Sequence, residues 1–259
     1  MPAEGGAAAP IDPVQGTLSL VIPAHNEALN MSPVLGAVRR VLPQLAREWE
    51  VVLVDDGSTD GTAEAARGVM AEDSAHLVVV THSHKSGYGI SVADGLRAAT
   101  GDVVAFMDGD GQFDVADLAQ LVAMLPDADL VGGWRLRRAD PWHRSVVSGT
   151  FNVFVRALYG IHYRDVDCGL KLMRREVLRA ATPLLARAAL LNTELYFKAG
   201  RSGFRIAQTG IPHHPRLAGR RSGGRLLPIL RAVRELVRLR LAIARSWRPP
   251  AAGPARRSG

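Results

Sequence analysis

The chain has 259 residues, 47% of them hydrophobic, and a single cysteine, so it can bury a large core but cannot form an internal disulfide. The formal net charge is +7, yet residues 216–259 hold twelve arginines and one acidic residue, which leaves the preceding 215 residues mildly acidic. No run reaches the roughly 18 consecutive apolar residues of a membrane-spanning helix, so we expect a soluble or peripheral protein. Residues 1–16, mostly small residues and proline, are typical of a disordered leader rather than a signal peptide.

Apolar runs rich in β-forming residues alternate with segments of helical spacing through the first half of the chain. Strands are predicted at Thr17–Pro23, Trp49–Asp55, His76–Thr81, Asp102–Asp108 and Ala128–Gly132. Helices are predicted between them at Glu27–Leu42, Thr59–Glu72, Gly89–Thr100 and Val115–Leu125. This alternation predicts an α/β fold with a mainly parallel sheet covered by helices on both faces, because strands covered on both sides are continuously apolar.

The pattern is looser after Gly133. Helices are predicted at Trp142–Tyr159 and Leu190–Arg201, and strands at Cys168–Arg174 and Phe204–Gln208. A basic loop then leads to a last helix, Leu226–Trp247, whose apolar residues recur at helical spacing, with its arginines mostly on the other side. The predicted units are therefore the leader at 1–16, a main domain at 17–225, an amphipathic basic helix at 226–248 and a disordered tail at 249–259.

Three polar clusters directly follow predicted strands. They are Pro23–Glu27, Asp55–Ser58 and Asp108–Gln112. In open α/β sheets, ligands bind beyond the carboxyl ends of the strands. If the strands are parallel, the three clusters meet along one rim, and this convergence predicts an active site there.

The third cluster ends an apolar strand with two carboxylates, Asp108 and Asp110, separated by one glycine. A hard cation such as Mg²⁺ takes oxygen ligands from one or two carboxylates and from substrate phosphates, and Gln112 offers a further carbonyl oxygen. Asp and Gly are also ordinary turn residues, so a solvated turn is the alternative. The chain lacks GxxxxGK[ST] and a clean GxGxxG after its first strand, which argues against a P-loop ATPase and a Rossmann dehydrogenase.

Four segments resemble, in order, the successive motifs of family 2 glycosyltransferases. They are Val21–Glu27 (VIPAHNE), Val54–Thr62 (VDDGSTDGT), Met107–Phe113 (MDGDGQF) and Asp167–Arg175 (DCGLKLMRR). Within that family the chain is most similar to dolichyl/polyprenyl-phosphate sugar synthases, over about residues 17–240. The resemblance implies a glycosyltransferase A fold, with residues 17–225 as the catalytic domain, and inverting transfer from a nucleotide-sugar with Mg²⁺ or Mn²⁺ as cofactor.

The same resemblance assigns roles to the three clusters. It gives the nucleotide-sugar to Pro23, Ala24, Glu27, Asp55 and Asp56, and the metal and diphosphate to Asp108, Asp110 and Gln112. The cation would stabilise the charge that develops on the departing nucleoside diphosphate. Lys85, in a glycine-containing segment before the third predicted helix, is a further donor ligand, because helix N-termini suit anions; a plain helix entry is the alternative.

Two further segments carry candidate residues. Glu194 lies where related enzymes that glycosylate hydroxyls have an acidic base, whereas a phosphate acceptor is already ionised and leaves Glu194 only a binding or positioning role. The basic loop resembles an Arg-x-x-Gly-x-Ser-Lys-like segment over the phosphates, although its Ser comes one position late and no Lys follows. Arg216 and Arg220 are its candidate phosphate ligands, since a guanidinium fork bonds two oxygens.

The leading hypothesis is transfer of a sugar from GDP-mannose or a UDP-hexose to a polyprenyl phosphate on the cytoplasmic, inner face of the cell membrane. The last helix would lie on the anionic membrane surface, or pack on the body instead. The alternative function has a saccharide or natural-product hydroxyl as acceptor and Glu194 as base. Nucleic acid is not an expected partner, because the body is acidic and the basic tail lacks interleaved aromatic residues.

Overall fold

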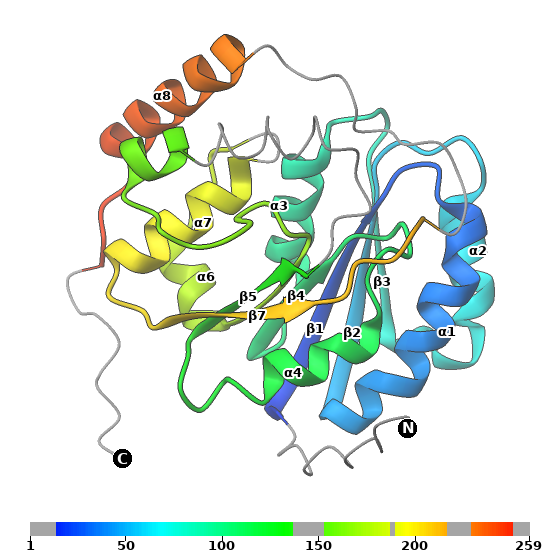
Figure 1. Cartoon of the computed structure of the whole chain (residues 1–259). Coiled ribbons are helices and arrows are strands. Elements are labelled where there is room, and N and C mark those ends of the chain that lie inside the picture. The colour runs from blue at the N-terminus through cyan, green and yellow to red at the C-terminus, as the bar shows by residue number, and fades with distance from the viewer. Residues whose placement is uncertain (1–13, 137–152, 187–189, 217–228, 251–259) are drawn as a thin grey trace, which may run out of the picture.

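A computed structural model describes residues 14–136, 153–186, 190–216 and 229–250, and within them one seven-stranded sheet organises the molecule (Figure 1). Its strands are β1 (Val14–Ala24), β2 (Ala46–Asp55), β3 (Leu77–Thr81), β4 (Val103–Met107), β5 (Leu130–Arg135), β6 (Leu170–Arg174) and β7 (Ile206–Ile211). Their order is β3-β2-β1-β4-β6-β5-β7. Strand β6 is antiparallel to both neighbours and every other pairing is parallel, so the prediction of a mainly parallel sheet is confirmed.

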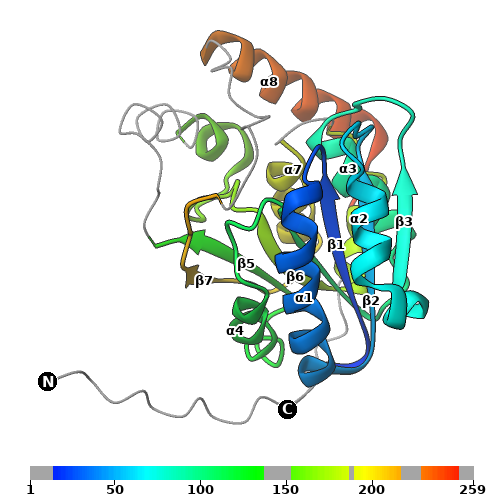
Figure 2. The ribbon, with the colours of Figure 1, turned by 90° about the vertical axis from the view of Figure 1, so that its right-hand side faces the viewer.

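Helices cover both faces of this sheet, as predicted. One face packs against α1 (Ala28–Leu45), α2 (Thr62–Val69) and α4 (Leu118–Val122). The other packs against α3 (Tyr88–Ala98), α6 (Arg175–Ala181), α7 (Leu190–Arg201) and α8 (Ile229–Ser246). Short 3-10 turns cover Ala71–His76 and Val115–Asp117. Figures 1 and 2 show α1 and α2 on one side of β1 and β2, with α3 and α7 on the other.

Successive strand residues point alternately into two cores, which explains why the strands are continuously apolar. In β2, Val51 and Leu53 pack in the core under α1, whereas Val52 and Val54 pack in the core under α3. The parallel register places Ala24, the last residue of β1, opposite the last residue of β2. Because the last residues of β1 and β2 are paired, the loops that follow the two strands begin next to each other.

The structure differs from the sequence-based boundaries at several places. Strand β1 begins at Val14, which is buried and pairs with Ala46, so the last three residues of the expected leader belong to the sheet. The sequence pattern does not reveal α6, because this short helix follows β6 without a break. Of the helix predicted at 142–159, residues 153–159 are helical and the rest lie outside the described residues.

The helix predicted at Val115–Leu125 is a 3-10 turn followed by the short α4. The Asp114 side chain caps the turn by accepting a hydrogen bond from the Ala116 N–H at 2.9 Å. Pro126 follows the segment directly, and the residue before a proline is disfavoured in the helical region. The segment therefore stays short at both ends.

Helix α8 packs on the main body along one face. Leu236, Leu239, Ile243 and Trp247 are buried in the same core as α6 and α7. The Tyr159 hydroxyl donates to the Leu236 carbonyl at 2.7 Å, and Trp247 Nε1 donates to the carbonyl oxygen of α6 residue 180 at 2.8 Å. The helix thus shares a core with the main domain. Within the described part of the chain, no helix combines the length and the apolar character needed to cross a bilayer.

Candidate active site

The first two polar clusters are joined by hydrogen bonds where β1 and β2 end. The N–H of Asp56 donates to the Ala24 carbonyl at 2.8 Å. The N–H of Asn26 donates to Ser58 Oγ at 2.9 Å, and the N–H of Glu27 donates to Oγ1 of the first α2 residue at 3.0 Å. The side chain of Asn26 in turn accepts from the N–H that follows Ser58. The two loops therefore form one surface above the sheet.

The third cluster joins this surface through the loop that follows β7. The backbones of Gln112 and His214 are linked by an N–H to carbonyl bond of 2.9 Å, and Gln112 Nε2 donates to the His214 carbonyl at 3.0 Å. Two residues further on, Arg216 forms an ion pair with Glu27 and places Nη1 3.8 Å from Asp110 Oδ2. Arg216 therefore bridges the first and third clusters, and Glu27, Asp110 and Gln112 are gathered around one loop.

Asp108 is a half-buried residue whose carboxylate has one buried oxygen with unused hydrogen-bonding capacity. Among the described residues, its Oδ1 has no partner of ordinary geometry, although the Tyr88 hydroxyl is close enough to favour the ionised form. Burial, and next the charge of Asp110, raise the pKa of Asp108 to about 7. Gly169 lies against this carboxylate, and a Cβ there would come within 2.0 Å of it. The end of β4 thus carries a carboxylate oxygen that can still accept a bond.

Lys171 supplies buried positive charge close to Asp108. Its ammonium group donates to the Cys168 carbonyl and lies 5.3 Å and 5.5 Å from the ring centroids of Phe106 and Tyr196. Burial lowers the pKa of Lys171, while Cys168, Asp167, Asp165 and Asp108 act in the opposite direction. The sequence motif contains Lys171, but sequence reasoning gave it no role. A lysine inside an apolar strand next to β4 was the signal available.

The donor set of Asp108, Asp110 and Gln112 fits a hard divalent cation. Two carboxylates lie one residue apart, and one of them, Asp108, has a buried oxygen without a partner in the described part of the chain and a raised pKa. A bound cation would lower that pKa. The Gln112 side chain also bonds the loop at His214, so its amide nitrogen is engaged. No group of three or more His, Cys, Asp or Glu side chains in the described residues could hold a metal. The remaining ligands would have to come from the substrate.

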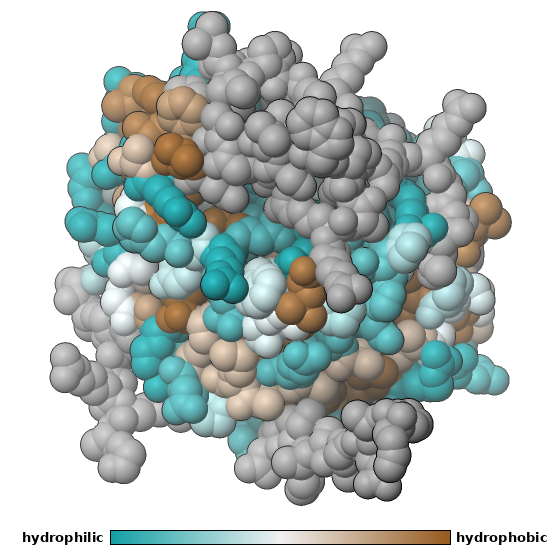
Figure 3. Space-filling model, in the orientation of Figure 1, coloured by the Kyte–Doolittle hydropathy of each residue, from teal (hydrophilic) through white to brown (hydrophobic). Residues whose placement is uncertain are grey.

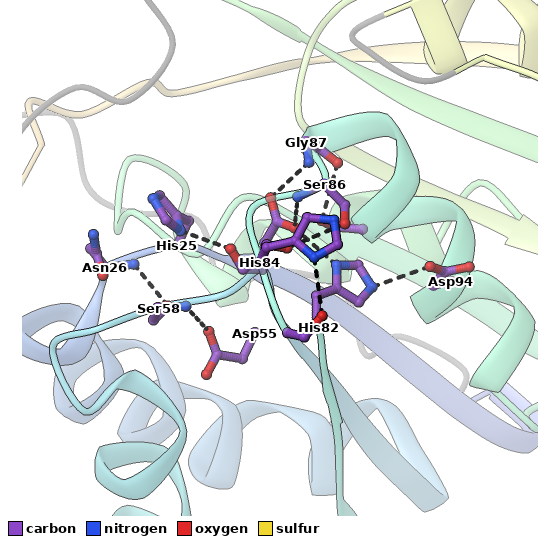
Figure 4. A network of polar contacts seen from close by, with 12 residues as sticks. His25, Asn26, Asp55, Ser58, His82, His84, Ser86, Gly87 and Asp94 are labelled. Carbon is purple, nitrogen blue, oxygen red and sulfur yellow. Dashed lines mark hydrogen bonds and ion pairs between the residues drawn. The ribbon is translucent and has the colours of Figure 1, made fainter.

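The two carboxylates at the end of β2 have different surroundings. Asp55 accepts a hydrogen bond from the Ser58 N–H at 2.9 Å. Asp56 accepts from the N–H groups of Ser86 and Gly87 at 2.7 Å and 2.9 Å and from the His82 ring (Figure 4). Burial opposes its charge, but these hydrogen bonds outweigh it and lower the pKa of Asp56. Asp56 therefore holds the loop that enters α3.

The chain matches the family "Glycosyl transferase family 2" over residues 19–181. It belongs to that family. An undecaprenyl-phosphate 4-deoxy-4-formamido-L-arabinose transferase of Aeromonas hydrophila subsp. hydrophila is 34% identical over 164 residues, 63% of this chain and 50% of that protein. A polyprenol monophosphomannose synthase of Mycolicibacterium smegmatis is 31% identical over 223 residues, 82% of each chain. The chain thus spans about half the length of the Aeromonas relative and most of the mycobacterial one.

Solved structures agree with the family 2 assignment at the level of the fold. Glucosyl-3-phosphoglycerate synthase of Mycobacterium tuberculosis, crystallised with Mn²⁺, UDP and phosphoglyceric acid, superposes with a TM-score of 0.64 at 21% identity. The match covers 91% of this chain and 80% of that one. The predicted glycosyltransferase fold and the resemblance to polyprenyl-phosphate sugar synthases are therefore both confirmed.

Not every predicted site residue of this family 2 chain joins the rim. Pro23 and Ala24 end β1 beside Asp55, and Lys85 is exposed in the loop above them. Glu194 is fully buried: its carboxylate pairs with Lys198 at 2.7 Å and accepts from the N–H groups of Leu185 and Ala186. Those contacts join α7 to the loop after α6, and none reaches the rim carboxylates. Arg220 lies outside the described residues.

Proposed function

We propose that the chain transfers a sugar from a nucleotide-sugar to a polyprenyl phosphate, with inversion at the sugar carbon and with Mg²⁺ or Mn²⁺ as cofactor. The observation that carries this is the pair Asp108 and Asp110 at the rim, beside Arg216, in a family 2 fold. The names of both relatives specify a polyprenyl-phosphate product or acceptor, which supports the acceptor class. The Mn²⁺ and UDP of the mycobacterial synthase structure support the cofactor and donor classes.

The rim residues suit the stabilisation of a departing diphosphate. A divalent cation supplies Lewis acid stabilisation of this leaving group, and Asp108, Asp110 and Gln112 would hold it. Arg216 is already aimed at Asp110 and is only 12% exposed, so its guanidinium can meet a phosphate with little loss of freedom. Its bond to Glu27 keeps the arginine in place before the donor arrives.

The donor would occupy the surface formed by the β1 and β2 ends. We assign the nucleoside to Pro23, Ala24, Glu27 and Asp55, and the diphosphate to Lys85 at the entry of α3, to Arg216 and to Arg220. Asp56 would act indirectly, because its carboxylate is saturated by Ser86, Gly87 and His82. GDP-mannose and a UDP-hexose are the two donors proposed.

A phosphate acceptor fits the state of Glu194 better than a hydroxyl does. A hydroxyl nucleophile needs a base within hydrogen-bond reach, whereas a phosphate monoester is already ionised. Glu194 has both oxygens engaged by Lys198 and two backbone N–H groups. It therefore has a structural explanation that does not involve proton transfer, and this supports the polyprenyl phosphate over the hydroxyl acceptor.

We further propose that α8 brings the protein to the anionic inner face of the membrane. Figure 3 shows hydrophobic side chains gathered at the upper left, where α8 and residues 153–159 lie in Figure 1. The exposed ones are Val153, Val237 and Leu241, at 61%, 40% and 50%. Arg234, Arg238 and Arg245 are exposed on the same helix. Exposed apolar and basic groups on one helix suit a peripheral contact with anionic lipid.

The proposal is tested by turnover with defined substrates. We expect product from polyprenyl phosphate and either GDP-mannose or a UDP-hexose in the presence of Mn²⁺ or Mg²⁺, and loss of product with EDTA. Asp110→Asn should lower kcat/KM by about 100-fold or more, because it removes one carboxylate from the cation. Asp127→Asn is the matched control, because Asp127 is exposed just before β5, at the end of the strands opposite to the rim. Full activity of Asp110→Asn would overturn the metal assignment.

Membrane attachment is tested separately by vesicle sedimentation. Val237→Ser combined with Leu241→Ser should reduce binding to vesicles that contain phosphatidylglycerol, with little change in Tm, because both side chains are solvent-exposed. Ala244→Ser, also exposed on α8, is the control. Equal binding of the double variant and the wild type would exclude α8 as the attachment surface.

A further inference from the structure

His82 lies between two carboxylates in the loop that follows β3. Its Nδ1 is 2.9 Å from Asp56 Oδ1 and its Nε2 is 3.1 Å from Asp94 Oδ2 (Figure 4). The His82 side chain is 12% exposed and that of Asp56 is 6% exposed, so little water reaches the first contact. The His82 N–H also donates to the Asp55 carbonyl at 2.9 Å, which fixes the backbone from which the ring projects.

Only a doubly protonated ring can donate to both carboxylates at once. A neutral imidazole has one N–H and one lone pair, so one of the two carboxylates would face a lone pair. The imidazolium donates to both. Other charged or titratable groups nearby are His25, whose Nδ1 bonds the Asp56 carbonyl, and Arg97, which pairs with Asp94; His84 and Lys85 lie on the same loop.

Through Asp56, His82 is connected to the backbone of the loop that enters α3. Asp56 Oδ1 accepts from both His82 and the Ser86 N–H, and Oδ2 accepts from the Gly87 N–H. Gly87 has a φ of +105° and directly precedes α3. On the facing turn, a Cβ at Gly57 would come within 2.6 Å of the His84 backbone. The loop that carries Lys85 is thus packed backbone to backbone on the donor surface.

We propose that protonated His82 is a positioning residue for the donor, which sets the His82–Gly87 loop through Asp56 and Asp94 and makes donor binding pH-dependent. This rests on the proposed function, because the loop matters only if a nucleotide-sugar binds beside it. When pH rises and His82 loses a proton, one ring–carboxylate bond is lost and two carboxylates face each other without a cation between them. The loop then loosens, so the donor KM rises while kcat is nearly unchanged.

The experiment measures kcat and donor KM from about pH 5 to pH 9, the range in which histidine changes charge. In the wild type we expect the donor KM to rise by up to about tenfold with pH, as one charge-assisted hydrogen bond is at stake. Asp94→Asn removes the second carboxylate, so its KM should vary far less with pH. His84→Asn is the control in the same loop, since the His84 ring bonds the neighbouring Ser83 hydroxyl and is not part of the Asp56–His82–Asp94 group. A wild-type KM that does not change with pH would overturn the proposal, as would an Asp94→Asn profile equal to the wild type.

A second measurement separates this inference from the proposed function. In NMR titrations of the protein without donor, the amide signals of Ser86 and Gly87 should shift together with the His82 ring, and Asp94→Asn should uncouple them. Amide signals that stay constant while His82 titrates would refute the positioning role even if the enzyme is active. Coupled shifts in a protein that turns over no nucleotide-sugar would instead refute the proposed function and leave the loop connection standing.

Discussion

The ends of β2 and β4 use the same kind of residue in opposite ways. Asp56, after β2, receives three hydrogen bonds, and its pKa is lowered although burial acts against its charge. Asp108, after β4, is half-buried, has one buried oxygen without a hydrogen-bond partner among the described residues, and lies near Asp110, so its pKa is raised to about 7. The difference lies in the hydrogen bonds available to each carboxylate. A saturated carboxylate organises the protein, whereas an unsaturated one can still bind a ligand.

Two other carboxylates extend the comparison on the saturated side. Glu194 is fully buried and bonded by Lys198 and two backbone N–H groups. Asp60 is exposed and accepts from the N–H groups of Ala28 and Thr62. If a carboxylate with all of its hydrogen bonds made has a structural role, substitutions at Asp56, Asp60 and Glu194 should lower stability, and the more buried the residue, the larger the loss. Substitution at Asp108 should lower activity alone.

Asp108→Asn should give the largest effect, on activity and not on stability. We expect kcat/KM to fall by about 100-fold or more, because a cation would lose an anionic ligand. Folded Asp108 has a pKa of about 7, above the unfolded value of about 3.9, so its ionisation makes the folded state less stable as pH rises through this interval. Asparagine cannot ionise, so Tm at pH 8 should be equal to or above that of the wild type. A lower Tm with retained activity would show that Asp108, like Asp56, has a structural role.

Glu194→Gln should have the largest effect on stability. Removing the charge leaves buried Lys198 without its carboxylate, and such a change typically costs about 3–5 kcal/mol. Urea denaturation measures the loss, and Lys198→Met added to Glu194→Gln should recover part of it. Turnover on polyprenyl phosphate should persist at a temperature where the variant is folded. Loss of turnover only on a hydroxyl acceptor, with normal stability, would instead favour the alternative function in which Glu194 is the base.

The sequence predicts the rim well and its supporting contacts poorly. The strand-end clusters could be placed together because parallel strands end on the same side of the sheet: Asp55 ends β2 and Asp108 directly follows β4. His82 and Lys171 were not found as functional candidates, because their significance depends on partners far away in the chain: Asp56 is 26 residues from His82. Lys198 lies four residues after Glu194 on the same helix, but the burial of Glu194 and its bonds from Leu185 and Ala186 depend on how α7 meets the loop after α6, which no local spacing encodes.

Asp56→Asn should lower stability by about 1–3 kcal/mol, since hydrogen bonds to a charged acceptor are lost or weakened. The pKa of Asp56 is lowered in the folded state, so its contribution is fully present above the unfolded value of about 3.9 and disappears as pH falls through the folded value. Urea denaturation at pH 7 and at lower pH should therefore show a difference from the wild type that shrinks in acid. A difference that is independent of pH would mean that the charge of Asp56 contributes nothing, and the contrast with Asp108 would fail.

Asp60→Ala should have the smallest effect, about 1 kcal/mol, as for the loss of a helix cap. Asp60 joins the starts of α1 and α2, because its two oxygens accept from Ala28 and Thr62 at 3.0 Å and 3.1 Å. With a third bond from the Thr62 hydroxyl, Asp60 accepts as many hydrogen bonds as Asp56, but water can replace part of them at this exposed position. Denaturation of the Asp60, Asp56 and Glu194 variants under one set of conditions tests this directly. Equal losses of unfolding free energy for Asp60→Ala and Glu194→Gln would show that the hydrogen bonds of the carboxylate matter whether or not it is buried. A loss that increases from Asp60 through Asp56 to Glu194 would show that burial determines how much such a carboxylate stabilises the fold.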